Sequence, residues 1–439
     1  MWHFKLRTMA RIGALACLSA ALSPMTVRAE NAQFSLLRTV SIEELNTILD
    51  RERGDFLKDD KAGPDYKLPS ASKASNAVDI YRVSYETSIP ERNNERVNVS
   101  GLLAIPKLSH RSQIPLMAYQ HGTVYDRYAV PSYAFKTSSP SAYDHRPESY
   151  EDRYMVALFG GNGYAVMSAD YVGMGDDTKH HEAYLTKGVS AQASLDLYHE
   201  VKRFLARQKI QPSNVFLGGW SQGGINTTGF LAKLESNRIP VKAAFTAAAP
   251  NDPLAALNAV MFHPLKTDSP FFGPMIGQLA FSCETYGGPK GLAKASLNPH
   301  YYTSLKSVYE RSYGKPEGDP NTLRQIMLSQ QNTANLDYIN DSLRNPAVLA
   351  QSDFGRCLAR NETYRQEFKT DLRMYYGSVD PIIRPRIGRL AYDYNLALNA
   401  TPEARAQISV TAIPVPGGTH RLTFITASVD AKAWMDSLR

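Results

Sequence analysis

The sequence has few cysteines and, beyond its first 22 residues, no long hydrophobic run. Only 3 of its 439 residues are cysteine. One of these, Cys17, lies in the hydrophobic run 12–22, which is too short to span a bilayer well. No later segment is long and apolar enough to form a membrane helix. The sequence therefore predicts no stable membrane anchor in the mature chain.

The N-terminus has the pattern of an export signal. Lys5, Arg7 and Arg11 precede or border the hydrophobic run, and small residues stand at Val27 and Ala29, the two positions that a signal peptidase reads. We expect a signal peptide over residues 1–29, a mature chain that starts near Glu30, and a secreted or periplasmic protein. An uncleaved signal-anchor is the alternative.

Charge of one sign is also scarce once the signal is removed. The formal net charge of the full chain is +7, and residues 1–29 hold four Lys or Arg and no Asp or Glu, so the mature chain carries about 7 − 4 = +3. Such a small surplus, spread over the whole chain, is not typical of nucleic-acid binding. The sequence predicts no nucleic-acid partner.

Two cysteines, Cys283 and Cys357, remain after signal cleavage. In an oxidising compartment an even pair favours one disulfide. Two buried free thiols are the alternative.

Hydrophobic periodicity predicts an α/β protein. Short apolar strands alternate with helical patterns over 76–250 and 367–439, which indicates a mostly parallel sheet flanked by helices. The region 251–366 lacks clear strands, and we interpret it as a helical cap inserted into that core. The region 30–75 is expected to be a peripheral N-terminal segment. Strands are predicted at 79–85, 97–105, 114–119, 164–169, 215–218, 241–247, 372–376 and 408–413, and helices at 41–49, 190–208, 223–234, 303–313 and 322–331.

A candidate nucleophile lies between one of these strands and the following helix. Gly219-Trp220-Ser221-Gln222-Gly223 matches G-x-S-x-G in the strand–turn–helix context that a nucleophile elbow requires. The glycines leave room for the strained turn that exposes the Ser oxygen at the end of the sheet. The plain alternative is a Gly-rich turn without chemistry.

A serine nucleophile needs a base, and the base needs a group that orients it. In proteins whose serine nucleophile lies in such an elbow, the three catalytic residues follow one another along the chain in the order Ser, acid, His. Asp380 follows the strand predicted at 372–376, and His420 follows the strand predicted at 408–413. Both loops lie at the edge of the sheet that carries Ser221, so the three side chains can converge. Taken alone, Asp380 would suit a turn before Pro381, and His420 would suit a helix start.

The oxyanion formed on attack needs two preorganised donors. We expect one to be the backbone N–H of Gln222, the residue after the nucleophile, and the other to be the N–H of Thr123 in the loop that follows strand 114–119. His121 precedes this loop directly, and its side chain is expected to pack beneath it.

Together these motifs resemble the α/β hydrolases, and more narrowly the secretory lipase family that includes yeast lipase A. The resemblance covers most of residues 76–439. It implies the α/β-hydrolase fold, a helical cap between Ser and Asp, and triad roles for Ser221, Asp380 and His420. It is carried by Tyr119-Gln-His-Gly-Thr123, Asp170-Tyr-Val-Gly-Met-Gly175, the elbow, Pro131-Ser132-Tyr133, Gly377-Ser-Val-Asp-Pro381 and Gly417-Gly-Thr-His420.

A dense group of potential metal ligands lies in the loop after strand 164–169. Such residues can hold a metal, but no second ligand group stands at a defined spacing, so we interpret the segment as a polar loop and predict neither metal nor cofactor. The group consists of Asp176, Asp177, His180, His181 and Glu182.

The sequence therefore predicts an exported serine hydrolase that cleaves a small-molecule or lipid carboxylic ester. A peptidase on the same triad is the alternative, with Glu284 or Glu310 of the cap as conceivable partners for a free α-amine. A non-catalytic binding module is a third reading. Aromatic and Met residues early in the cap are expected to line the substrate pocket; they are Phe262, Phe271, Phe272, Met275 and Phe281.

Overall fold

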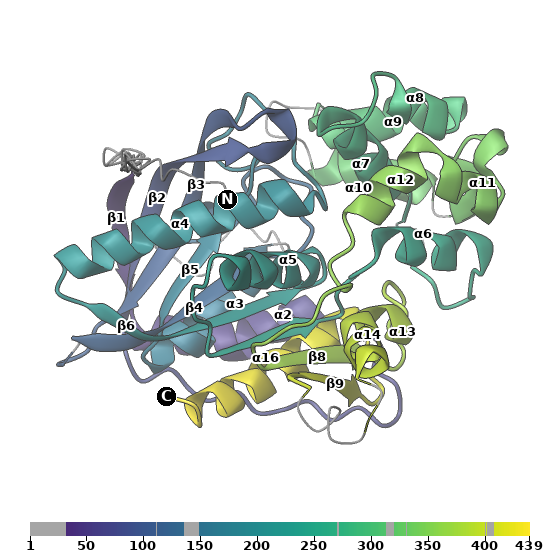
Figure 1. Ribbon diagram of the computed structural model, residues 1–439. Helices are drawn as coiled ribbons and strands as arrows, with labels where there is room; N and C mark the ends of the chain where they lie inside the picture. The colour runs from purple at the N-terminus through teal and green to yellow at the C-terminus, as the bar shows by residue number, and fades with distance from the viewer. Residues whose placement is uncertain are drawn as a thin grey trace, which may run out of the picture. The chain divides into compact units, whose positions relative to one another are not determined.

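A nine-stranded sheet runs through the described part of the chain in this computed structural model (Figure 1). The structure describes residues 32–110, 112–135, 149–269, 272–312, 320–330, 332–399, 401 and 408–439, so the predicted signal peptide lies outside it. In sheet order the strands are β1 (Gln33–Val40), β2 (Val78–Ile89), β3 (Glu95–Pro106), β5 (Ala165–Ala169), β4 (Gln113–Gln120), β6 (Gln211–Trp220), β7 (Ala243–Ala247), β8 (Leu372–Gly377) and β9 (Val410–Val415).

The sheet has an antiparallel and a parallel half. β1, β2 and β3 pair antiparallel, as do β3 and β5, whereas β5, β4, β6, β7, β8 and β9 pair parallel. Gln120 pairs with Gly219, and Trp220 pairs with Ala247, so β4, β6 and β7 end at nearly the same level. Because parallel strands end at one edge, the loops that follow them meet there.

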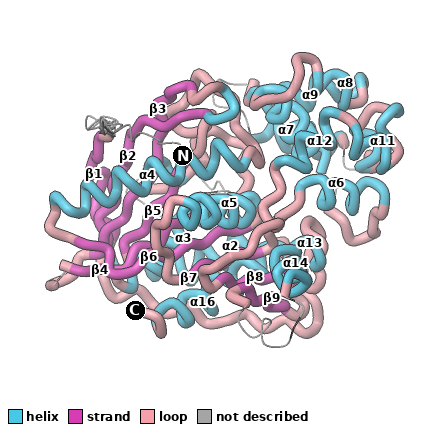
Figure 2. The backbone as a smooth tube through the Cα atoms, viewed as in Figure 1, coloured by secondary structure: helices cyan, strands magenta, loops and turns pink. Residues whose placement is uncertain are grey.

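Helices cover both faces of the sheet (Figures 1 and 2). Successive strand residues point to opposite faces, and Phe216 and Leu217 of β6 accordingly enter two different hydrophobic clusters. One cluster includes residues of α4 and α5, and the other includes residues of α3 and α16. The helices around the sheet are α1 (Ile42–Thr47), α2 (Arg53–Leu57), α3 (Tyr150–Phe159), α4 (Lys187–Arg207), α5 (Gln222–Ser236), α13 (Pro385–Gly388), α14 (Leu390–Leu398) and α16 (His420–Asp436).

The chain between β7 and β8 forms a group of helices, which we call the helical insertion. It has a hydrophobic cluster of its own, and a disulfide between Cys283 and Cys357 joins α7 to α12. The only β pairing that involves its described residues is an isolated bridge between Leu297 and Ile339. Its helices are α6 (Pro253–Phe262), α7 (Phe272–Thr285), α8 (Leu292–Ser296), α9 (Pro299–Glu310), α10 (Pro320–Ser329), α11 (Pro346–Gln351) and α12 (Asp353–Arg360).

The predicted strands are confirmed, but β1 and α3 were missed. β1 lies in the segment expected to be peripheral, and it forms the edge of the sheet. Its side chains do not alternate between buried and exposed, since the adjacent Leu36 and Leu37 are both exposed. The helix predicted at 303–313 ends early because Arg311 adopts a left-handed conformation with φ 53°.

The start of α1 agrees with the sequence only in part. The Ser41 hydroxyl accepts the Glu44 N–H at 3.1 Å, as a helix cap should. The Glu44 carboxylate pairs with Arg38 of β1. The predicted helix 41–49 also continues further, as a π-helical turn over Ile48–Glu52.

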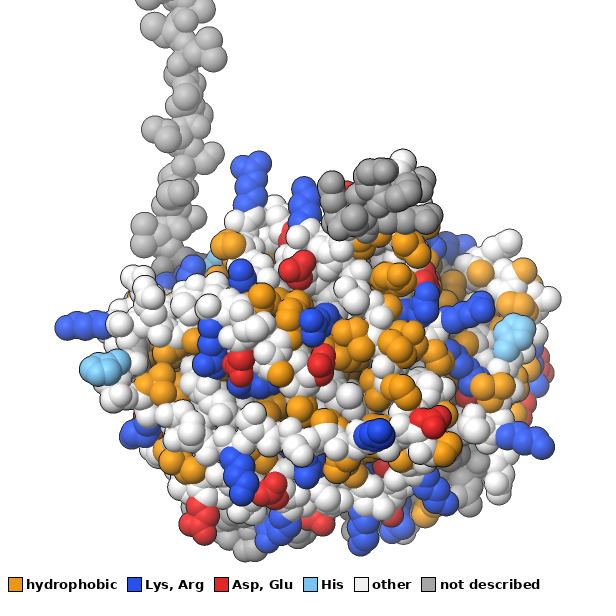
Figure 3. Space-filling model, turned by 90° about the horizontal axis from the view of Figure 1, so that it is seen from below, with side chains coloured by type: hydrophobic (Ala, Val, Ile, Leu, Met, Phe, Trp, Pro, Cys, Tyr) orange, Lys and Arg blue, Asp and Glu red, His pale blue; other side chains and the backbone are white. Residues whose placement is uncertain are grey.

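None of the helices in the described ranges is long and apolar enough to cross a membrane. On the face shown in Figure 3, basic and acidic side chains are interspersed, and several hydrophobic side chains gather toward the middle of the face.

Candidate active site

Ser221 lies on a sharp turn between the end of β6 and the start of α5. Its backbone has φ 56° and ψ −121°, a conformation that costs energy for a residue with a side chain. The turn is held by hydrogen bonds from the Ser221 N–H to the Ala247 carbonyl and from the Gly224 N–H to the Ser221 carbonyl, each at 2.9 Å. This is the geometry of a nucleophile elbow.

The two motif glycines are required by close backbone contacts. A Cβ atom on Gly223 would overlap the carbonyl oxygen of Gln120, at the end of β4. A Cβ atom on Gly219 would overlap the carbonyl oxygen of Gly223 itself. The strand and the helix on either side of Ser221 can therefore approach each other only when both positions lack a side chain.

Asp380 and His420 form a hydrogen-bonded pair. The Nδ1 atom of His420 lies 2.9 Å from Oδ2 of Asp380. The other carboxylate oxygen of Asp380 accepts the N–H groups of Ile382 at 2.8 Å and Ile383 at 2.9 Å. Both residues are buried, with exposed fractions of 6% for Asp380 and 7% for His420. The carboxylate is thus fixed on both sides and holds the imidazole ring in one orientation.

Ser221, His420 and Thr123 line a single cleft with a volume of about 430 Å³. They come from the loops after β6, β9 and β4, which meet at one edge of the sheet as the sequence suggested. His420 is the first residue of α16, and the hydroxyl of the preceding Thr419 caps that helix by accepting the Leu422 N–H. The structure therefore brings the proposed nucleophile, base and oxyanion loop to one place.

The two expected oxyanion donors border the same space. Gln222 is the first residue of α5, where a helix leaves its N–H groups without intrahelical acceptors. Within the described residues, neither the Gln222 N–H nor the Thr123 N–H donates a hydrogen bond to another group. The Thr123 side chain is anchored, since its hydroxyl lies 3.0 Å from the hydroxyl of Tyr184.

His121 packs beneath the oxyanion loop, as predicted. Its imidazole is fully buried, stacks on Tyr171 at 4.3 Å between ring centroids, and bonds the Gly122 carbonyl through Nδ1 at 2.8 Å. Burial lowers the pKa of His121, which favours the neutral ring at physiological pH.

A buried glutamate behind the oxyanion loop escaped the sequence analysis. Glu151 of α3 lines the cleft, accepts the Gly122 N–H, and accepts the Tyr119 hydroxyl at 3.1 Å. Burial raises the pKa of Glu151 to about 8. The sequence gives little hint of this, because glutamate is mostly exposed in folded proteins and the two partners of Glu151 lie 29 and 32 positions away along the chain.

The N-terminal segment also reaches the cleft. Phe56 of α2 packs edge-on against the Trp220 ring at 5.9 Å, and Asp60 accepts the Thr419 hydroxyl at 2.6 Å. Trp220 in turn donates its indole N–H to the His420 carbonyl at 3.0 Å. The N-terminal segment, which was expected to be peripheral, thus contacts Trp220 and Thr419, the two residues that adjoin His420 in the site.

A second, narrower pocket opens beside Ser221. It lies between the elbow and helices α6 and α7 of the insertion, and hydrophobic side chains make up most of its wall. Of the insertion residues expected to line a pocket, Phe272 and Met275 do so, whereas Phe262 and Phe281 lie in the hydrophobic cluster of the insertion away from it. Phe271 lies outside the described residues.

Most of the potential metal ligands in the polar loop after β5 take part in ion pairs and hydrogen bonds within the protein. Asp176 pairs with Arg82, and the Asp177 carboxylate lies 2.8 Å from Nδ1 of His180. Glu182, which is fully buried, pairs with Arg311 at 2.6 Å and accepts the Gln222 side-chain amide at 2.9 Å. Among the described residues, no group of three or more His, Cys, Asp or Glu side chains is placed to hold a metal ion.

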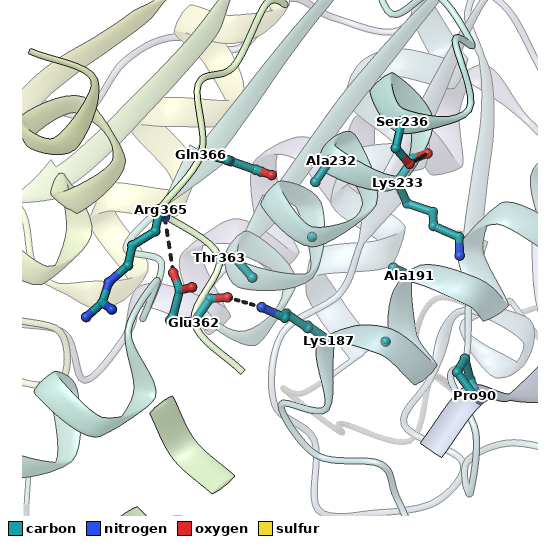
Figure 4. Close-up of a pocket in the computed structure, with 12 residues that line it drawn as sticks. Pro90, Lys187, Ala191, Ala232, Lys233, Ser236, Glu362, Thr363, Arg365 and Gln366 are labelled. Atoms are coloured by element: carbon teal, nitrogen blue, oxygen red, sulfur yellow. Dashed lines mark hydrogen bonds between the residues drawn. The ribbon is translucent and has the colours of Figure 1, made fainter. Parts of the chain in front are cut away.

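A further groove, of about 380 Å³, lies away from Ser221 where the insertion returns to the core (Figure 4). The Lys187 ammonium donates to the Glu362 carbonyl at 2.7 Å, and the Lys187 N–H donates to the Asn361 side chain at 3.1 Å. These bonds attach the first turn of α4 to the segment that follows α12. The groove therefore marks the attachment of the insertion.

Comparison with solved structures identifies the fold. A Legionella pneumophila protein provisionally assigned as a hydrolase superposes with a TM-score of 0.72 and 18% identity, covering 92% of this chain and 97% of its own. The rice cell wall degrading esterase LipA from Xanthomonas oryzae gives a TM-score of 0.69 at 18% identity, covering 93% and 98%. Candida antarctica lipase A gives 0.57 at 17% identity, covering 78% and 73%.

The chain has the α/β-hydrolase fold, and the resemblance to lipase and esterase folds inferred from its motifs is confirmed. No protein-family model matches the chain, and no curated protein matches it in sequence.

Proposed function

We propose that this protein is an exported serine hydrolase that cleaves carboxylic esters through an acyl-enzyme. The observation that carries the proposal is the bond between Asp380 and His420, 2.9 Å long, at the wall of a cleft that Ser221 also lines. The esterase and lipase among the structural neighbours support the same class of reaction.

Each group has a defined part in the proposed reaction. The Ser221 oxygen attacks the ester carbonyl while Nε2 of His420 takes its proton, and Asp380 holds Nδ1–H and stabilises the imidazolium. The N–H groups of Gln222 and Thr123 bind the oxyanion. His420 then protonates the leaving alcohol, and a water molecule, deprotonated by His420, hydrolyses the acyl-enzyme. Apart from this water molecule, every reacting group in the proposed mechanism belongs to the chain or to the ester.

The peptidase alternative receives little support from the cap glutamates. Glu284 accepts the Ala293 N–H at 2.8 Å, and Glu310 pairs with Lys306. Neither is among the described residues that line the two pockets beside Ser221. Asp59 and Asp60 do line the cleft, so amide substrates belong in the test.

Export is part of the proposal. The disulfide between Cys283 and Cys357 supports it, because such bonds persist mainly in oxidising compartments. Expression of the full chain in a bacterial host, with N-terminal sequencing of the protein outside the cytoplasm, is expected to give a start near Glu30. Retention of Met1 in that material would contradict cleavage.

The decisive assay compares nitrophenyl butyrate with aminoacyl arylamides, using the wild-type chain and Ser221→Ala. We expect ester hydrolysis by the wild type and a loss of about 10,000-fold or more in kcat for Ser221→Ala. Turnover of the arylamides alone would favour the peptidase. Turnover of neither class by a folded wild-type chain would favour a binding module.

A further inference from the structure

Two spaces of very different size border Ser221. The narrow pocket between the elbow and the insertion has a volume of about 50 Å³, whereas the cleft has a volume of about 430 Å³. The cleft also contains the charged side chains of Asp59, Asp60 and Arg421. An ester bound at Ser221 must place its acyl part in one space and its alcohol part in the other.

The position of His420 decides between them. The imidazole must reach the oxygen of the leaving alcohol in order to protonate it. His420 lines the cleft and is not among the residues of the narrow pocket, whereas Ser221 and Gln222 line the narrow pocket together. The alcohol therefore belongs in the cleft. The acyl group, which stays on Ser221, belongs in the narrow pocket.

The wall of the narrow pocket is apolar and well packed. Met275 and Ile382 border both spaces and separate them. The remaining wall includes side chains of α6 and α7 with exposed fractions of 8% or less, and these belong to the hydrophobic cluster of the insertion. They are Leu257, Val260, Phe272, Ile276 and Leu279. A wall of this kind accepts hydrocarbon but does not widen without loss of packing.

We infer that the narrow pocket is a short acyl site, so that the preferred substrates are esters of short, unbranched acids with a larger polar alcohol. The pocket has little more than a tenth of the volume of the cleft, about 50 Å³ against about 430 Å³, so it has room for only a few carbon atoms beyond the carbonyl carbon. That length corresponds to butyryl to hexanoyl groups. The inference rests on the proposed ester hydrolysis and adds a limit on chain length to it.

The test is a series of nitrophenyl esters from acetate to dodecanoate with the wild-type chain. Burial of each methylene raises kcat/KM by about fourfold until the pocket is full. We expect the maximum of kcat/KM between butyrate and hexanoate. At octanoate kcat/KM should fall by roughly tenfold or more, because the extra carbon atoms of the acyl group would have to force the packed wall apart.

Three variants locate the site. Leu279→Ala removes part of the wall and should move the maximum to longer chains. Ala256→Phe fills the pocket and should lower butyrate turnover at least tenfold more than acetate turnover. Leu305→Ala is the matched control, because Leu305 is fully buried in the same cluster but does not line the pocket, so it should leave the length profile unchanged.

The wild-type profile decides the inference even where a variant folds poorly. A maximum at acetate, or at octanoate or longer, would overturn it, as would an unchanged profile in folded Leu279→Ala. Absence of activity on every ester in the series would instead overturn the proposed function.

Discussion

The nine-stranded sheet with the helices that flank it, which we call the sheet domain, and the helical insertion contribute differently to this molecule. In the sheet domain, Ser221, Asp380 and His420 each follow the end of a strand, and hydrogen bonds to neighbouring backbone fix the elbow and the carboxylate. The insertion supplies the apolar side chains of α6 and α7 that line the narrow pocket, and it is held by its own hydrophobic cluster and one disulfide. Under the proposed function, the sheet domain supplies the chemistry and the insertion limits which substrate fits. If so, changes in each region should alter different measurements.

The largest effect is expected from the sheet domain. Asp380→Asn should lower kcat/KM for the preferred ester by about 10,000-fold, because an amide favours the wrong tautomer of His420. The melting temperature should change far less than the activity does. Asp353→Asn, at an exposed position in the insertion, is the control and should retain full activity. An Asp380→Asn protein with near-normal turnover would contradict the assignment of Asp380.

A smaller effect, on stability, is expected where the two regions meet. Arg311→Ala leaves the buried Glu182 carboxylate without its cation, which should lower the free energy of unfolding by about 3–5 kcal/mol. Because Glu182 also holds the Gln222 side chain, turnover of every ester should fall together. Arg356→Ala removes an exposed ion pair instead and should cost about 0–1 kcal/mol. If urea unfolding gave the same loss of stability for Arg311→Ala and Arg356→Ala, the proposed role of the Arg311–Glu182 pair would be contradicted.

Removal of the disulfide should act on the insertion alone. The bridge closes a loop over a sequence separation of 74, and its loss in the Cys283→Ser/Cys357→Ser protein should cost about 2–4 kcal/mol. Looser packing of α7 against α12 should blunt the acyl-length preference more than it lowers acetate turnover. Calorimetry and the ester series measure the two effects. If the double variant kept the acyl-length preference of the wild type, the disulfide would have no part in substrate selectivity.

The smallest effect concerns pH. Burial raises the pKa of Glu151 to about 8 from an ordinary value of 4.5. The folded state therefore favours the neutral carboxyl, so its contribution to stability is complete below about pH 4.5 and is lost as the pH rises to about 8. Above pH 8 a negative charge beside Gly122 should also disfavour the oxyanion and lower kcat/KM.

Glu151→Gln is expected to remove both of these decreases, since the amide resembles the neutral acid. Glu43→Gln, at an exposed position in α1, should keep the wild-type pH profiles. If wild type and Glu151→Gln had identical pH profiles, both for kcat/KM and for stability in denaturant unfolding, Glu151 would not be the group that causes these decreases.

The sequence predicted the sheet domain better than the site's surroundings, for a physical reason. Local patterns determine that Ser221 follows a strand and that Gly219 and Gly223 flank it, and a rule of chain order led to Asp380 and His420. The contribution of Phe56 and Asp60 depends on contacts with residues more than 150 positions away. No local pattern reports such contacts. The buried state of Glu151 is hidden in the same way, because its partners come from β4 and the following loop.

The size of the narrow pocket beside Ser221 also could not be predicted from the sequence. The abundance of Phe and Met early in the insertion indicated an apolar lining, but Phe281 packs against Tyr302 and Tyr309 instead of lining the pocket. Which side chains border a cavity depends on how α6 and α7 pack against the elbow. Composition alone does not contain that information.

Labelling with a fluorophosphonate, followed by mass spectrometry of the modified peptide, tests the central claim most directly. The account predicts a single label per native chain, on Ser221, that disappears in Ser221→Ala and forms far more slowly in His420→Ala. A native chain that hydrolyses esters yet carries its label on another residue would contradict the account, and so would one that remains unlabelled.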